Sequence, residues 1–134
     1  MEVGPERKGS VFLMTVFVIA LLSAVVMGIA QMNTEEIQLM QNQIYAVHAL
    51  ATAEAGLNDA FSQIIEDLSW VDGFNNKAFN GGVYDVNVIG TLPNRTIEST
   101  GTTAQGFVAK VEADITVGSS SPYIIRIDNL RINE

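Results

Sequence analysis

The sequence lacks cysteine entirely and contains a single histidine, His48. Without cysteine, the chain forms no disulfide scaffold, no thiol nucleophile and no cysteine-ligated metal site. With one imidazole, a multi-histidine metal site or a serine-type catalytic triad is hard to build unless a partner contributes residues. We therefore expect neither an enzyme nor a cofactor-binding protein.

Basic residues are also scarce. Seven lysines and arginines stand against fifteen aspartates and glutamates, which gives a net charge of −8 at pH 7. Charged residues make up 16% of the chain, whereas soluble domains typically contain about 25%. Because nucleic acids are bound through clusters of lysine and arginine, a chain with no basic stripe is not expected to bind them directly.

Charge is absent from one long run near the start of the chain. Ser10 to Ala30 is a stretch of 21 mostly apolar residues with neither charge nor proline. As a helix it is about 31 Å long, which matches a hydrocarbon core of about 30 Å. Arg7 and Lys8 precede the run, and the next basic residue is Lys77. The positive-inside tendency then places residues 1–9 in the cytoplasm and the bulk of the chain outside.

Two other interpretations of this run stay open. It could be a plain single-pass anchor, or it could be a cleaved secretory signal. Gly28-Ile29-Ala30 has the small-x-small form of a signal peptidase site. The apolar stretch before that site is, however, longer than the 7–15 residues that are typical of secretory signals.

The helical pattern continues beyond the apolar run. Gln31 to Trp70 contains no proline, and its apolar residues recur every three or four positions, as in an amphipathic helix. The apolar positions are Ile37, Met40, Ile44, Val47, Leu50, Leu57, Phe61, Ile64 and Leu68. The opposite face holds Gln38, Gln41, Asn42, Gln43, Thr52, Asn58 and Asp59. Joined to the apolar run, this segment predicts one helix of about 59 residues, roughly 88 Å long.

The last part of the chain predicts an antiparallel sheet. Trp70 to Gly82 is rich in glycine and asparagine and is predicted to be a loop, in which Trp70, Phe74 and Phe79 cap the core. Alternating apolar and polar residues then predict four strands, at Val83–Gly90, Arg95–Thr100, Gly106–Val117 and Tyr123–Ile132. The expected fold class is α+β, with the apolar side of the helix packed on a small four-stranded antiparallel sheet.

Three stretches of the chain together resemble the type IV pilin and pseudopilin superfamily, and most of all the PilX-type minor pilins. The first is Arg7-Lys8-Gly9-Ser10 before the apolar run. The second is the alanine-rich segment Ala51 to Ala60, which contains Ala53-Glu54-Ala55. The third is Tyr84 to Val117, which is similar to the strand pattern of the family.

The resemblance implies an organisation in four parts and a processing route. Residues 1–9 are a class III leader, residues 10–30 the transmembrane and filament-core helix, residues 31–70 the amphipathic helix, and residues 71–134 the loop and sheet. Prepilin peptidase is expected to cut after Gly9, and Ser10 then becomes an N-methylated terminus. The implied partners are the inner membrane before assembly and other pilin subunits, bound through the N-terminal helix in a filament.

The sequence departs from the family at two positions. Most pilins have phenylalanine directly after the cut, where this chain has Ser10. Most also have glutamate as the fifth mature residue, where this chain has Met14. In the family that glutamate is thought to pair with the amino terminus of a neighbour. A subunit without it fits best where no neighbour lies ahead, so the resemblance implies a tip or priming subunit.

Some alternatives stay open at this point. A minor pseudopilin of type II secretion shares this architecture, and a bitopic membrane protein that presents an extracytoplasmic binding domain would share the anchor. Glu54 lies among the apolar positions of the amphipathic helix, which we call the apolar seam. Its carboxylate either contacts a partner subunit, or contacts Arg95 or Lys110 of the sheet, or reaches solvent from the edge of the seam. His48 is expected to be a partly buried polar residue. The loop residues Asp72, Asn75 and Asn76 are candidate calcium ligands, although their spacing is not that of an EF-hand.

Overall fold

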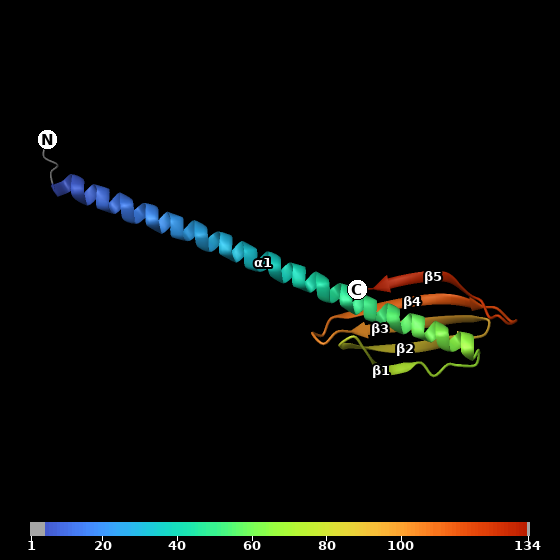
Figure 1. Cartoon of the computed structure of the whole chain (residues 1–134). Coiled ribbons are helices and arrows are strands. Elements are labelled where there is room, and N and C mark those ends of the chain that lie inside the picture. Colours follow the sequence, from blue (N-terminus) through green and yellow to red (C-terminus); the bar gives the residue numbers. More distant parts are fainter. Residues whose placement is uncertain (1–4, 134) are drawn as a thin grey trace. The chain divides into compact units, whose positions relative to one another are not determined.

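The protein is an α+β chain with one long N-terminal helix and one antiparallel sheet (Figure 1). The computed structural model describes residues 5–133, and their side chains from Gly9 onward. The helix α1 spans Pro5–Glu66, and five strands follow in chain order. They are β1 (Phe74–Phe79), β2 (Gly82–Thr91), β3 (Asn94–Thr102), β4 (Val108–Val117) and β5 (Ile125–Asn133). The chain divides into two units, Met1–Gln41 and Asn42–Glu134, and the second contains the whole sheet.

The sheet has five strands rather than the expected four, in the order β1-β2-β3-β4-β5. The additional strand, β1, lies inside the segment predicted to be a loop, and it pairs with β2 through Ala78 and Val83. Asn80 and Gly81 join the two strands with positive φ angles of 46° and 82°. Asn-Gly with both φ angles positive is the signature of a type I′ hairpin turn. The asparagine and glycine that predicted a loop are therefore the tight turn of a hairpin.

The helix ends four residues earlier than predicted, at Glu66 rather than Trp70. The side chain of Asp67 accepts hydrogen bonds from the backbone amide of Ser69 (3.0 Å) and from its hydroxyl (2.6 Å). An aspartate that bonds the backbone two residues onward forms a local turn, which competes with continuation of the helix.

Small residues, rather than the large ones of the predicted seam, bring α1 against the sheet. Ala49, Ala53, Gly56 and Ala60 are spaced three or four apart, and all four are buried. A Cβ atom at Gly56 would lie 2.4 Å from Oγ of Ser99, so helix and strand are in close contact. The predicted seam is therefore only partly correct: Leu57 and Ile64 are buried, but Ile37, Met40, Ile44 and Val47 are exposed, and Thr52 of the expected polar face is buried.

The core lies between α1 and the middle of the sheet. Alternate residues of β2, β3 and β4 point toward the helix, as expected for a sheet covered on one side. The buried members are Ala53, Leu57, Ala60, Ile64, Tyr84, Val86, Ile97, Val111, Ala113, Ile115 and Val117. Trp70 and Phe74 pack against this cluster, as predicted, whereas Phe79 is exposed.

Candidate functional site

The first candidate surface is the apolar part of α1. The helix contains an 18-residue window of mean hydropathy 2.7, none of it buried, so it is long and apolar enough to cross a membrane. Two of its hydroxyl groups bond within the helix: Thr15 Oγ1 donates to the Val11 carbonyl at 2.9 Å, and Ser23 Oγ to the Ile19 carbonyl at 2.8 Å. Such internal bonds suit a helix in lipid, where no water is available to pair with a polar group.

The residues expected to be processed lie at the start of this helix. Gly9, Ser10 and Met14 are helical and exposed, and a Cβ atom on Gly9 would meet nothing within 4 Å. The backbone of Arg7 and Lys8 belongs to α1, but their side chains lie outside the described part of the chain, as do residues 1–4 of the expected leader.

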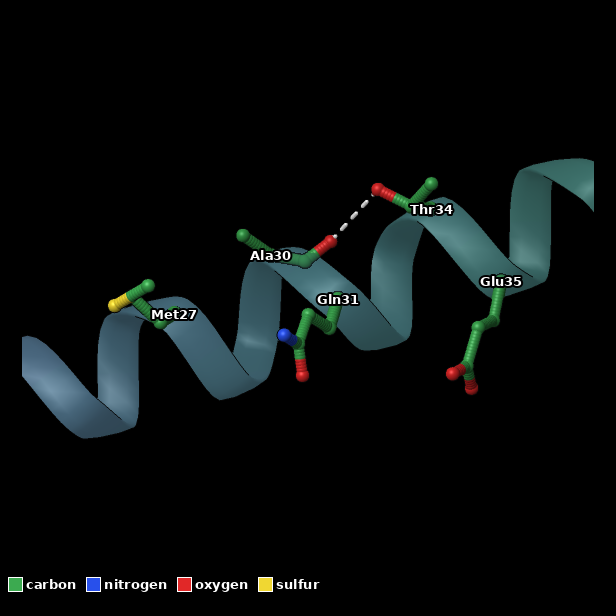
Figure 2. Close-up of a pocket in the computed structure, with 5 residues that line it drawn as sticks. All are labelled: Met27, Ala30, Gln31, Thr34 and Glu35. Atoms are coloured by element: carbon green, nitrogen blue, oxygen red, sulfur yellow. Dashed lines mark hydrogen bonds between the residues drawn. The ribbon is translucent and has the colours of Figure 1, made fainter.

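A shallow depression lies on α1 at the end of the apolar run. Figure 2 shows Met27, Ala30, Gln31, Thr34 and Glu35, all on a single helix, with the Thr34 hydroxyl donating to the Ala30 carbonyl at 3.0 Å. Small-molecule sites are concave and enclose most of their ligand. A depression bounded by one helix does not enclose a ligand, so we assign it no binding role.

Glu54 is exposed on α1, and neither of its predicted partners within the chain contacts it. Lys110 instead forms an ion pair with Glu98 at 3.2 Å on the sheet, and Arg95 bonds backbone carbonyls. The predicted contact between Glu54 and Arg95 or Lys110 is therefore wrong for the described residues. The carboxylate reaches solvent, as the alternative interpretation held.

Arg95 stabilises the segment that follows α1. Its guanidinium is buried and donates from Nη1 to the carbonyls of Leu68 (2.8 Å) and Trp70 (3.1 Å). The last turn of α1 has no basic residue of its own. A cation near the carboxyl end of a helix interacts favourably with the helix dipole, so a residue of β3 supplies what the helix sequence lacks. This role was not predicted from the sequence, although the alternation of β3 places Arg95 on the same face as Ile97 and Ser99.

Asp59, Lys77 and Tyr84 connect α1 to β1 and β2. The Tyr84 hydroxyl donates to Asp59 Oδ2 at 2.5 Å, and Lys77 forms an ion pair with the same carboxylate. The Lys77 ammonium also lies 4.4 Å from the centre of the Phe74 ring, within reach of a cation–π interaction. Burial acts to raise the pKa of Asp59, but hydrogen bonds from Lys77 and Tyr84 outweigh it and lower this pKa below its usual value. Burial, with the bond to Asp59, raises the pKa of Tyr84.

His48 lines a second depression, where the β1–β2 and β3–β4 turns approach α1. The other lining residues are Tyr45, Thr52, Asn80, Gly81, Gly82, Thr103, Ala104 and Gln105. His48 is exposed rather than partly buried as predicted. None of these lining side chains is a carboxylate, so the depression offers no acid–base pair.

The candidate calcium ligands lie at or just before the start of strand β1. Asn75 and Asn76 form an irregularity in the pairing of β1 with β2, and the backbone amide of Asn76 donates to Asp85 Oδ1 at 2.8 Å. Asp72 lies just before β1 and is exposed. Across residues 5–133, no group of three or more histidine, cysteine, aspartate or glutamate side chains is placed to hold a metal ion.

Acidic residues on the outer face of the sheet are matched by arginine and lysine. Glu98 and Glu112 are direct neighbours across β3 and β4, where like charges destabilise a sheet. Lys110 pairs with Glu98, and Arg131 pairs with both Glu112 and Asp114. This pairing explains how an acidic chain can carry carboxylates side by side on one face.

Comparison with known proteins adds no relative: no family model, no curated protein and no solved structure matches this chain.

Proposed function

We propose that this protein is a structural, non-enzymatic subunit of a membrane-derived filament, a minor pilin-like subunit of a type IV pilus. One observation carries the proposal. A single helix of 62 residues contains an exposed apolar run that could span a membrane, and its last part packs on an antiparallel sheet. An apolar helix of this kind packs equally well in lipid and among its own copies, so it moves between the two without meeting water.

The proposed route begins in the inner membrane. The chain crosses once, with its amino terminus in the cytoplasm and the sheet domain outside. Prepilin peptidase removes residues 1–9, Ser10 is methylated, and the helix enters a filament of related subunits. Support comes from Arg7 and Lys8 before the run and from the exposed, sterically free glycine at position 9.

Met14 supports a place at the tip or in priming. It stands where related subunits carry a glutamate, and a buried carboxylate needs a partner of opposite charge. A subunit with Met14 has no carboxylate to pair with the amino terminus of a neighbour ahead of it. At a filament end no such neighbour is present, so the missing carboxylate leaves no amino terminus unpaired.

Mass spectrometry of the mature chain from its native host tests this function. A terminus at Ser10 with one added methyl group is the expected result. An intact Met1 would instead indicate a bitopic anchor, and a terminus at Gln31 a secreted protein. Either result overturns the proposal.

Gly9→Leu and Gly28→Leu form a matched pair for the cleavage step, because a Cβ atom at either position meets no neighbour within 4 Å. Only Gly9→Leu is expected to retain the leader. Cleavage of both variants would contradict a cut that depends on Gly9. A type II secretion pseudopilin would share the processed terminus but would be found in a short periplasmic filament rather than in sheared surface pili.

A further inference from the structure

Three glycines of the sheet domain follow a residue whose side-chain carbonyl carbon can react with the next backbone amide. The pairs are Asp72-Gly73, Asn80-Gly81 and Gln105-Gly106. When the glycine nitrogen attacks this carbon, a ring closes and the side chain loses ammonia or, from aspartate, water. Glycine favours the attack because it has no side chain to hinder the approach and its backbone rotates easily. The folded chain restrains the three pairs to different degrees.

Two of these glycines are held in place. Gly73 lies against β2, where a Cβ atom on it would meet the Val86 carbonyl oxygen. The Gly106 amide donates a hydrogen bond to the Thr103 carbonyl at 3.0 Å. A nitrogen that is packed against a strand, or engaged in a hydrogen bond, turns toward the preceding side chain only by breaking that contact, which costs free energy.

Neither constraint applies to Gly81. It is exposed, and a Cβ atom on it would meet nothing within 4 Å. Its amide lies outside the ladder between β1 and β2, whose last pair is Phe79 and Gly82. Asn80 is also exposed and has a φ of 46°, a left-handed conformation that is uncommon for residues other than glycine. Asn80-Gly81 is therefore the least restrained of the three pairs.

The strand that leads into this turn has few buried contacts of its own. β1 is an edge strand, with a neighbouring strand on one side only (Figure 1). Residues 75–79 are exposed, and the pairing of β1 with β2 is irregular between Phe74 and Lys77. Segments of this kind open locally while the core stays folded. The Asn80-Gly81 turn can therefore leave its I′ geometry without loss of the core.

We propose that the fold selects Asn80 as a site of spontaneous deamidation. The Gly81 nitrogen attacks Cγ of Asn80 and forms a new N–Cγ bond. The bond from Cγ to the side-chain nitrogen breaks, and that nitrogen leaves as ammonia with the proton of the Gly81 amide. Water then opens the five-membered ring. Addition of water at Cγ gives aspartate, and addition at the backbone carbonyl carbon gives isoaspartate, whose main chain runs through Cβ and Cγ.

The reaction places a carboxylate at a depression whose described lining side chains include none. Asn80 lines this depression together with His48 and Gln105. Each converted chain gains one negative charge in addition to its −8. In isoaspartate the main chain is also one methylene longer. The two-residue I′ turn matches the twist of its strands only with normal backbone geometry, so the pairing of Phe79 with Gly82 is weakened. Deamidation thus changes both the charge and the shape of this surface.

Peptide mass spectrometry of the full chain in detergent tests the site. Tryptic cleavage after Lys77 and Arg95 gives a peptide that contains Asn80, Asn87 and Asn94. After incubation at mildly alkaline pH, we expect the mass gain of an amide-to-acid exchange at Asn80 alone, in two products that separate on chromatography as aspartate and isoaspartate. Asn80→Gly should show no gain in this peptide, and its Gly-Gly sequence is also accepted in an I′ turn.

Asp72→Asn is the matched control, because it places a second asparagine before a glycine, at the crowded Gly73. A digest that also cuts after Glu66 isolates position 72 in a short peptide. In the folded chain we expect this pair to react at least severalfold more slowly than Asn80. In denaturant neither pair is restrained, so the two rates should be similar.

Two results would overturn the proposal. One is an unchanged Asn80 in the folded chain under conditions in which the denatured chain is deamidated there, because the turn would then protect it. The other is equally fast reaction at Asn80 and at position 72 of the Asp72→Asn variant in the folded chain, because the fold would then not select the site. The reaction requires neither leader cleavage nor assembly, so its outcome is independent of the proposed function.

Discussion

Gly101 of β3 lies against the backbone of Ala49 in α1, so closely that a Cβ atom on Gly101 would be 2.4 Å from the Ala49 carbonyl oxygen. The same atom would be 2.5 Å from the Ala53 amide nitrogen. Because the neighbours are backbone atoms, they cannot rotate away. Nearby, the Ser99 hydroxyl donates to the Ala53 carbonyl at 2.6 Å. Helix and sheet are thus held at a separation that only small residues allow.

Gly101→Ala is expected to lower the free energy of unfolding by about 1–3 kcal/mol, since overpacking forces the backbone to shift. Thermal unfolding of the detergent-solubilised chain, followed by circular dichroism, measures the loss. Gly28→Ala is the control, because a side chain there meets nothing within 4 Å and alanine favours the helix. Equal stability of Gly101→Ala and the wild type would contradict the close contact.

Acid is expected to weaken the connection between Asp59, Lys77 and Tyr84. The pKa of Asp59 is lowered in the folded state, whereas an unfolded aspartate has a pKa near 3.9. The stabilisation is therefore present above about pH 4 and is lost as pH falls through the folded pKa. Asp59→Asn should lose less stability than the wild type between pH 7 and pH 3. The exposed Asp72→Asn variant should behave like the wild type, and an identical pH profile for Asp59→Asn would exclude this role.

At high pH the same cluster should weaken again. A hydrogen bond from Lys77 to Asp59 raises the pKa of Lys77, and burial raises that of Tyr84. Groups with raised pKa values contribute stability that is complete below their unfolded values, near 10, and is lost as pH rises through the folded values. Tyrosine absorbance during an alkaline titration should show a late component in the wild type that is lost in Tyr84→Phe. The same titration curve in Asp59→Asn as in the wild type would rule out the bond to Asp59.

Arg95→Met is expected to destabilise the sheet domain by about 2 kcal/mol or more, because the Leu68 and Trp70 carbonyls lose their buried donor. Chemical denaturation of the purified chain measures the change. Arg126→Met removes an exposed pair with Asp128 and should alter stability by less than about 0.5 kcal/mol. Similar losses in the two variants would mean that Arg95 is not a structural donor.

Immunogold labelling of purified filaments tests the role given to Met14. The wild-type chain is expected at filament ends, because it offers no carboxylate to a neighbour ahead of it. Met14→Glu should extend labelling along the filament. Wild-type protein spread evenly along filaments would reject the tip position.

Local patterns along the chain predict the helix and most of the sheet. Periodicities of 3.6 and 2.0 follow from local geometry, so α1 and strands β2 to β5 could be predicted to within a few residues. Strand β1 was missed because asparagine and glycine predict turns, although Asn80-Gly81 is a local signal for a hairpin.

Which face of the helix is buried, and what surrounds Glu54 and Arg95, depends on how the folded chain brings helix and sheet together. The 3.6-residue period shows which side of the helix is apolar, but it does not show how much of that side the sheet covers. Ile37 to Val47 therefore match the pattern yet stay exposed, while Ala49, Ala53 and Gly56 pack on β3. Close packing depends on the shape of both surfaces. Small residues on the helix and on the strand are therefore recognised as a contact only once the chain has brought them together.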